Sequence, residues 1–389
     1  MNHEQSPIRV AHFYSSLGIY GAERWVVTLL KYLDRRRVSS IVVTVGSKPG
    51  ARLLHDLVIK EGHKAVHIDV PGKLNPRAVR QLRTFLQDEK IEILHTHGFK
   101  SDVIGYFATR GLPVKLVSTL HGWSVVEGAR IGVYEAIGRF FLRRFDRLYP
   151  LSPALLEDLQ TRGFDAGRMR LILNAVDIGA FDWCYQNRRY RSAGEPLRIL
   201  FAGRLCKPKG VSFLIQAMAK ATFSCDAKLQ IVGDGPDRGE LERLTNDLKL
   251  GDKVQFMGVA KNIGPFLAES DVLALPSFCE GVRCEGIPRI IMESFSAGVP
   301  VIGSSIPGIR ELIDDRNTGL LFPVGDADKL ARALEVMAEE PDVAREMAMR
   351  ARMRVESTFS AIRLARELEE EYEELAQSSG AFIPIVKVG

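Results

Sequence analysis

The chain has 389 residues, of which 46% are hydrophobic and 26% are charged, and its formal net charge is +5. This length predicts two globular domains, and the composition is typical of a folded protein rather than a disordered one. No apolar run reaches the roughly 18 residues that a membrane-spanning helix needs, and the N-terminus lacks the basic and apolar segments of a secretory signal. We therefore expect a cytoplasmic protein with no nucleic-acid partner.

The cysteines and the charge distribution narrow the class further. The five cysteines show no zinc-type repeat, and the pair Cys279 and Cys284 has no second pair and no nearby histidine. We therefore expect five reduced thiols and no metal site. Residues 1–185 hold 26 Lys and Arg against 18 Asp and Glu, whereas residues 186–389 hold 27 against 30. This imbalance predicts that the first half faces something anionic, such as a phospholipid surface or a phosphate-bearing acceptor; ordinary surface charge is the alternative.

In chain order, short β-rich apolar runs alternate with amphipathic helical stretches, a pattern typical of parallel sheets with crossover helices. The helices predicted in the first half include Ala22–Leu33, Pro76–Asp88 and Lys100–Thr109. The strands predicted there are Ile8–Phe13, Ser40–Val45, Ala65–Ile68, Ile91–His95, Lys115–Leu120 and Arg147–Pro150. The second half restarts the alternation, with strands predicted at Leu197–Ala202, Lys228–Val232, Val254–Met257, Val272–Leu275 and Pro300–Gly303.

A polar, turn-rich segment, Gln186–Pro196, is the expected linker between the halves. We therefore predict an α/β protein with an N-terminal domain over 1–185 and a second domain over 186–360. Each domain is expected to be doubly wound and Rossmann-like, with the two facing a central cleft. Residues 361–389, which include an acidic helix, are expected to pack back toward the N-terminal domain. In such sheets, ligands bind outside the carboxyl ends of the strands.

The segment 276–298 carries the densest group of chemically useful residues. It reads PSFCEGVRCEGIPRIIMESFSAG, with Glu285 and Glu293 eight residues apart and Pro288 between them. Pro288 suits the first turn of a helix, where the free N–H groups of Gly286–Ile287 would point toward an anion or a hydroxyl. Carboxylates also accept hydrogen bonds from vicinal sugar hydroxyls. The pattern predicts a site for a polyhydroxylated, phosphate-bearing ligand; capping and surface roles for the two glutamates are the alternative.

Two glycine-containing turns of the second half also follow predicted strands. FAGRLCKPKG places Gly203 at a strand end, with Arg204 beside it and Lys209 five residues after Arg204. A planar guanidinium and an ammonium group suit a diphosphate, although two exposed surface cations are the alternative. GDGPDRG begins at Gly233 and has the spacing GxGxxxG, which differs from the dinucleotide fingerprint. It predicts a phosphate- or nucleoside-adjacent turn, or a tight loop, rather than a dehydrogenase.

The first half supplies a further glycine turn and three histidines. GIYGAE follows the first strand, and its Gly21 permits close backbone approach of a ligand at a helix start. His121, in STLHGW, ends a predicted strand and could donate a hydrogen bond to a phosphate or a sugar hydroxyl; a structural role is the alternative. His95 and His97 alternate at another strand end, where no third metal ligand is apparent.

Taken together in this order and spacing, the motifs resemble the retaining glycosyltransferases of the large GT-B family 4, over residues 8–376. Spacing selects Glu285 rather than Glu280 as the first glutamate of that family's Glu-x7-Glu motif, because Pro288 lies eight residues after Glu280. The segments that carry the resemblance are Gly18–Glu23, His121, Asn174–Asp177 (NAVD), Gly203–Gly210, Val232–Pro236 and Glu285–Glu293.

The resemblance implies a role for each candidate residue. Arg204 and Lys209 would clamp the donor diphosphate, and Glu293 would bind the nucleotide ribose. Glu285 would contact the donor sugar hydroxyls, and His121 would lie near the sugar and the reaction centre. The backbone would approach the donor at Gly21, Gly203, Gly233, Gly286, Ile287 and Pro288.

This chain departs from the family's pattern at two places. Tyr20 replaces the first glycine of the usual pair, so access at that loop is expected to differ. The stretch between Pro276 and Glu285 is longer than usual and contains Arg283, which is a candidate contact to the donor.

The resemblance implies transfer of a sugar from a UDP- or GDP-sugar to a hydroxyl of a saccharide or lipid-linked acceptor, with anomeric configuration retained. We expect no metal and no other cofactor, and a place in bacterial cell-surface polysaccharide or lipopolysaccharide biosynthesis. Basic residues of Pro76–Asp88 and Arg139–Arg147 suggest peripheral contact with the inner face of an anionic membrane. The alternatives are another GT-B enzyme, such as a sugar-nucleotide epimerase or a soluble disaccharide synthase, and a non-catalytic nucleotide-sugar-binding subunit.

Overall fold

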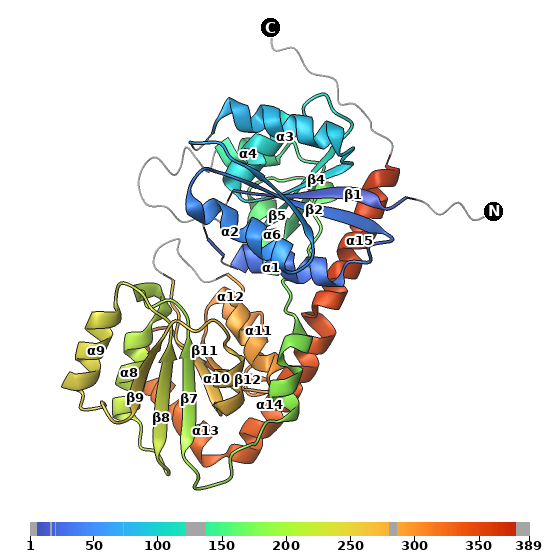
Figure 1. The fold of residues 1–389 in the computed structure, drawn as a ribbon. Coiled ribbons are helices and arrows are strands. Elements are labelled where there is room, and N and C mark those ends of the chain that lie inside the picture. Colours follow the sequence, from blue (N-terminus) through green and yellow to red (C-terminus); the bar gives the residue numbers. More distant parts are fainter. Residues whose placement is uncertain are drawn as a thin grey trace. The chain divides into compact units, whose positions relative to one another are not determined.

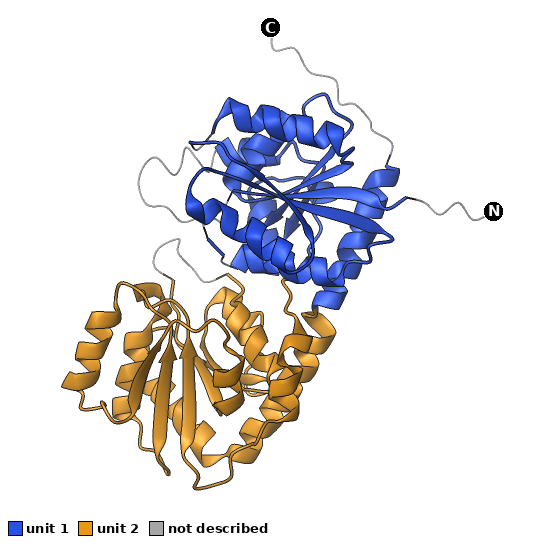
Figure 2. Cartoon of the chain, in the orientation of Figure 1, with its two compact units in different colours: residues 1–173, 361–389 blue, residues 174–360 orange. Residues whose placement is uncertain are grey.

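The computed structural model describes residues 6–15, 18–19, 21–72, 74–121, 137–279 and 286–378. Contacts divide the chain into two units (Figure 2): unit 1 comprises residues 1–173 and 361–389, and unit 2 comprises residues 174–360. Residues 174–185, expected in the first domain, belong to unit 2. There, Asp182 pairs with Arg352 at 2.6 Å, and the Cys184 thiol donates to the carbonyl oxygen of Gly264.

Unit 1 is built on a six-stranded parallel sheet with the order β3-β2-β1-β4-β5-β6 (Figure 1). The central strands are nearly continuous runs of buried residues, as expected for a parallel sheet covered on both faces. The strand order reverses between β1 and β4, which is where doubly wound sheets bind ligands. The strands are β1 (Ile8–Tyr14), β2 (Val38–Val45), β3 (Lys64–Ile68), β4 (Ile93–His97), β5 (Lys115–Leu120) and β6 (Arg147–Pro150).

The helices of unit 1 include the last helix of the chain, α15 (Ala361–Gln377). Its buried stripe, which includes Leu364, Leu368 and Tyr372, follows the helical period. Its acidic residues are bound to unit 1, because Arg37 pairs with Glu373 at 2.7 Å. The expected return of this helix to the N-terminal domain is therefore seen in these contacts. The other helices are α1 (Gly21–Tyr32), η1 (Pro49–Arg52), α2 (Leu53–Lys60), α3 (Pro76–Asp88), α4 (Phe99–Thr109), α6 (Pro153–Thr161) and η2 (Ala166–Arg168).

Unit 2 repeats the same topology. Its sheet has the order β12-β11-β10-β7-β8-β9, so the reversal falls between β7 and β10. The strands are β7 (Leu197–Ala202), β8 (Ala227–Val232), β9 (Val254–Gly258), β10 (Val272–Leu275), β11 (Val301–Ser304) and β12 (Gly319–Phe322). The helices are η3 (Ile178–Phe181), α7 (Asp182–Gln186), η4 (Lys207–Lys209), α8 (Val211–Lys220), α9 (Arg238–Asp247), α10 (Gly264–Glu269), α11 (Arg289–Ser296), α12 (Pro307–Arg310), α13 (Ala327–Glu339) and α14 (Pro341–Thr358).

The cysteines differ from expectation at one place. Cys184, Cys206 and Cys225 are free thiols, as predicted. Cys279 is disulfide-bonded, so the expectation of five reduced thiols is wrong. Spacing alone did not indicate this bond, because a pairing depends on how the loop after β10 folds. Among the described helices, none is both long enough and apolar enough to cross a membrane.

Candidate functional site

The loops that leave the carboxyl ends of β7, β8 and β10 form one connected layer in unit 2. Residues 203–210, which follow β7, pair through their backbone with the loops on either side. Because the strand order reverses between β7 and β10, this layer surrounds the expected ligand position of the sheet. The bonds are Gly203 N to Val232 O at 3.0 Å, Leu205 N to Asp234 O at 2.9 Å and Phe278 N to Pro208 O at 2.8 Å.

Two glycines allow these loops to approach one another. Gly210 has φ +64°, and a Cβ there would lie 2.1 Å from the carbonyl oxygen of Pro276. Gly233 has φ +142°, and its Cβ would lie 1.8 Å from the carbonyl oxygen of Gly203. Both positions combine a backbone conformation that favours glycine with a contact to rigid main chain. The glycines of these two motifs are therefore needed for loop packing in the unliganded protein.

Two cations lie on the turn between β7 and α8. Arg204 is exposed and has no hydrogen-bond or ion-pair partner among the described residues. Lys209 is half-buried, and its Cε lies 3.9 Å from the position that a Cβ at Gly203 would take. The stem of Lys209 therefore crosses the first glycine of the turn. This arrangement places two positive charges at the carboxyl edge of the sheet, where they suit a diphosphate.

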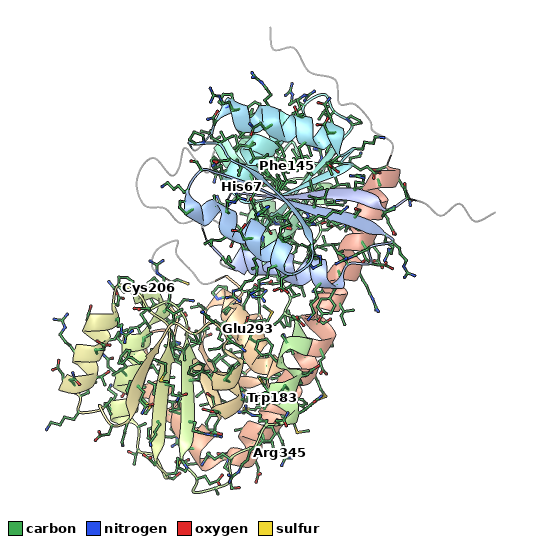
Figure 3. The ribbon with its side chains drawn as sticks, viewed as in Figure 1. His67, Phe145, Trp183, Cys206, Glu293 and Arg345 are labelled. Carbon is green, nitrogen blue, oxygen red and sulfur yellow. The ribbon has the colours of Figure 1, made fainter. Side chains whose placement is uncertain are left out.

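Helix α11 carries Glu293 and begins directly after Pro288, which occupies the capping position. The helix therefore begins one residue later than expected, and its first N–H groups belong to Arg289 and Ile290 rather than to Gly286–Ile287. The Glu293 side chain is 17% exposed, and its Oε1 lies 3.7 Å from Nε of Arg289. Figure 3 shows Cys206 and Glu293 toward the same end of unit 2. Glu285, Arg283 and Glu280 lie outside the described residues.

Arg289 is a site residue that the sequence analysis missed. Besides contacting Glu293, it donates from Nη1 to the carbonyl oxygen of Ala175 at 3.2 Å. Ala175 belongs to the segment Asn174–Asp177, so this arginine connects that motif to the helix that carries Glu293. An arginine four residues before a glutamate on a helix was the available signal.

In unit 1, the candidates lie at the carboxyl ends of β1, β4 and β5. Gly21 is the first residue of α1, and a Cβ there would meet no atom within 4 Å. Packing against the described residues therefore does not require glycine at this position. His121 follows β5, and its Nε2 lies 3.3 Å from Nδ1 of His97. The indole of Trp25, on α1, meets the His121 ring edge-on at 5.6 Å. Tyr20 lies outside the described residues.

Comparison with known proteins identifies the fold and the class of this chain. The model of Glycosyltransferase Family 4 matches residues 19–179, and the model of Glycosyl transferases group 1 matches residues 196–340. The two matches lie in the two halves that carry the motifs. The chain belongs to glycosyltransferase family 4. It is an enzyme of the glycosyltransferase class, as its motifs predict.

Named relatives of this glycosyltransferase act in different syntheses. It is 29% identical over 294 residues to N-acetyl-α-D-glucosaminyl L-malate synthase of Bacillus anthracis, covering 74% of this chain and 75% of the relative. It is 26% identical over 361 residues to the lipopolysaccharide core biosynthesis glycosyltransferase LpsE of Rhizobium meliloti, covering 91% and 95%.

Solved structures show the same GT-B fold. Anabaena HepE in complex with UDP has a TM-score of 0.79 and 20% identity, over 94% of this chain and 100% of that one. The apo lipopolysaccharide outer core galactosyltransferase WaaB has a TM-score of 0.73 and 17% identity, over 94% and 100%. These likenesses confirm the predicted α/β architecture with two doubly wound units.

This glycosyltransferase also holds a buried histidine cluster that the sequence analysis did not find. His12 on β1 and His95 and His97 on β4 are fully or almost fully buried, and nitrogens of the three lie within 4.8 Å of one another. His12 supplies the third nitrogen that was not apparent from the alternation of His95 and His97. Its position follows from the register of β1, in which His12 pairs with His95. Spacing within one strand could not reveal a partner on another.

A buried carboxyl lies near the histidine-bearing strand. Asp102 on α4 accepts hydrogen bonds from the hydroxyls of Thr96, at 2.5 Å, and Ser118, at 2.9 Å. Thr96 lies between His95 and His97 on β4, and Ser118 lies on β5, so Asp102 connects α4 to both strands. Burial raises the pKa of Asp102 to about 7, although the two hydroxyls oppose that shift.

Proposed function

We propose that this enzyme transfers a sugar from a nucleotide diphosphate sugar to a hydroxyl of a saccharide or lipid-linked acceptor, with retention of anomeric configuration. The observation that carries the proposal is the layer of loops at the switch point of unit 2. That layer combines the cations Arg204 and Lys209 with glycine turns and precedes the helix that carries Glu293. The printed names of relatives and neighbours, which include UDP and UDP-glucose complexes of HepE, support a nucleotide-sugar donor.

In the proposed donor site, Arg204 and Lys209 hold the diphosphate, and their charge stabilises the leaving nucleoside diphosphate. Glu293 accepts hydrogen bonds from the ribose hydroxyls, and Arg289 holds its carboxylate in place. The free N–H groups at the start of α11 favour the negative charge of the donor. Glu285, with the backbone of Gly286 to Pro288, contacts the sugar. Gly21 and His121 of unit 1 complete the site, as the family resemblance implies.

Cationic side chains in this role supply the positive charge that a divalent metal supplies in other enzymes, so we propose a metal-independent reaction. The bond between the anomeric carbon and the phosphate oxygen breaks, and a bond from the acceptor oxygen to the anomeric carbon forms on the same face. The acceptor proton passes to the departing phosphate oxygen, which is the nearest developing base. This sequence retains configuration without a carboxylate nucleophile.

The nucleotide can be identified from thermal stability. Unfolding temperatures are measured with UDP, GDP and ADP and with UDP- and GDP-sugars. A ligand at 100 times its Kd adds about 2.7 kcal/mol to the stability of the folded state. We expect one nucleotide family to raise the unfolding temperature by several degrees, with its nucleoside alone as the control. No shift with any diphosphate would contradict the proposal.

For the acceptor, we propose a saccharide carried on a lipid at the inner face of the cytoplasmic membrane, in the synthesis of a surface polysaccharide or lipopolysaccharide. Relatives support this choice by name, for example an Escherichia coli galactosyltransferase that acts on α-D-GlcNAc-diphosphoundecaprenol, at 24% identity over 96% of this chain. In unit 1, Phe107 and Phe140 are 48% and 51% exposed and both contact the ring of Phe141. Arg144 lies 3.6 Å from the ring centroid of Phe140.

This aromatic–basic patch (Phe107, Phe140, Phe141 and Arg144) suits the interface of an anionic bilayer. The basic helix α3 contributes less than expected, because Arg83 donates to the carbonyl oxygens of Ala108 and Arg110. We expect the enzyme to float with liposomes containing anionic phospholipid at low salt, and a Phe107→Ser/Phe140→Ser variant to float several-fold less. Ile362→Ser, at an apolar residue 50% exposed on α15, is the matched control. Equal flotation of both variants would refute the patch.

A further inference from the structure

Three imidazoles form a hydrogen-bonded row that leads from the core of unit 1 to His121. Nδ1 of His12 lies 3.3 Å from Nε2 of His97, and Nδ1 of His97 lies 3.3 Å from Nε2 of His121. We propose that His97 and His12 are positioning residues that hold His121 in the neutral tautomer with its proton on Nδ1. The inference rests on the proposed role of His121 at the reaction centre.

The row couples the tautomers of its members. A neutral imidazole has one N–H donor and one lone pair. Because His97 uses both nitrogens within the row, it must donate at one end and accept at the other, and all three rings therefore donate in the same direction. Burial favours the neutral forms: it lowers the pKa of His12 to about 3 and, with the neighbouring imidazoles, lowers the pKa of His97 well below its usual range.

The inner end of the row decides the direction of donation. Nε2 of His12 is buried and has no hydrogen-bond partner among the described residues. If His121 donated inward, this Nε2 would carry a buried N–H without an acceptor, which is the rarer kind of unsatisfied group. In the opposite direction, Nε2 carries only a lone pair. Nδ1–H of His12 then donates to His97, and Nδ1–H of His97 donates to Nε2 of His121.

The surroundings hold the row in place. His95, beside it, has Nδ1 2.6 Å from the hydroxyl oxygen of Tyr372 on α15 and Nε2 2.7 Å from Oγ1 of Thr119 on β5. The ring of Tyr14 stacks on His97 at 4.2 Å with an angle of 9°. These contacts from β1, β5 and α15 restrict rotation of the imidazoles.

The same geometry favours hydrogen bonding over a metal ion in the cluster of His12, His95 and His97. The rings of His95 and His97 are inclined by 19°, and those of His12 and His97 by 27°. Imidazole lone pairs lie in the ring plane, so nearly parallel stacked rings do not direct their lone pairs to one point. Both nitrogens of His95 also already meet hydroxyl groups.

The tautomer determines what His121 does in the reaction. With Nε2 accepting from His97, the nitrogen that remains for a ligand is Nδ1, and it carries a proton. His121 would therefore donate a hydrogen bond to a hydroxyl or phosphate oxygen of the substrate. It would not serve as the general base of the transfer.

The test reads the tautomers directly. The chain is labelled with ¹⁵N-histidine, and long-range ¹H–¹⁵N correlation spectra are recorded, with the His121 signals assigned by their loss in His121→Gln. We expect a protonated Nδ1 and an unprotonated Nε2 in the wild-type protein. A protonated Nε2, or rapid averaging of two tautomers, would overturn the proposal. Because the spectrum requires no transfer activity, it remains informative if the proposed function fails.

Two substitutions at His97 separate positioning from packing. Asn places an amide N–H at the same distance along the side chain as Nδ1, whereas Phe keeps a ring but removes the donor. We expect His97→Phe to lower kcat at least about tenfold, as loss of an oriented catalytic group does, with donor KM nearly unchanged. His97→Asn should recover most of kcat and the Nδ1–H signal of His121. Equal losses in the two variants would show packing alone.

Discussion

Replacing Lys209 by alanine is expected to lower kcat by about 10² to 10³, the usual cost of removing one group that stabilises developing charge. Lys209 lies over Gly203 at the carboxyl edge of the unit 2 sheet, where its ammonium group is proposed to meet the departing diphosphate. Its loss removes charge that matters most in the transition state, so kcat should fall more than donor KM rises. Steady-state rates of nucleoside diphosphate release with saturating acceptor provide the measurement.

Lys228→Ala is the matched control. Lys228 is exposed near the start of β8, at the opposite end of the same sheet, and its removal also deletes one positive charge. We expect kcat of this variant to stay within about twofold of wild type, as for most surface substitutions. A similar fall in both variants would point to net charge, and a normal rate in Lys209→Ala would remove the lysine from the site.

Replacing Gly233 by alanine is expected to destabilise unit 2 by more than about 3 kcal/mol, because it combines backbone strain with a steric overlap. The new Cβ would lie 1.8 Å from the carbonyl oxygen of Gly203 at φ +142°. Neither loop can move freely, since Gly203 N donates to Val232 O and Gly233 N donates to Gly258 O. For a unit of this size, the unfolding transition in scanning calorimetry should fall by roughly 6–12 °C.

Gly239→Ala, in the same motif, serves as the comparison. Gly239 lies in α9, and a Cβ there meets nothing within 4 Å. Alanine is the better helix former, so the unfolding temperature should stay the same or rise slightly. If Gly233→Ala were as stable as Gly239→Ala, the tight packing of the loops after β7 and β8 would be wrong.

Much of the fold could be predicted because buried parallel strands read as apolar runs between amphipathic helices. Even so, β4 ends at His97 rather than His95, since polar residues continue the strand at its carboxyl end. β12 was missed, because Gly319–Phe322 has only four residues and begins with glycine. The division at residue 174 was also missed, since the ion pair of Asp182 with Arg352 joins positions far apart in sequence.

The candidate site was predictable where its residues follow one another along the chain. Gly203, Arg204 and Lys209 lie in a single turn, so their spacing carries the signal. The row of His12, His97 and His121 depends instead on strand register and on the ends of three strands, which no local pattern encodes. Likewise, the contact of Arg289 with Ala175 brings together residues far apart in sequence.

Hydrogen–deuterium exchange with and without the nucleoside diphosphate that most stabilises the enzyme tests the central claim most directly. The claim is that the loop after β7 and the start of α11 hold the donor. It predicts slower exchange in peptides that cover residues 203–210 and 286–293 when the ligand is bound, where the first helical N–H groups have no intrahelical acceptor. Unchanged exchange in both segments, with protection confined to other parts of the chain, would contradict it.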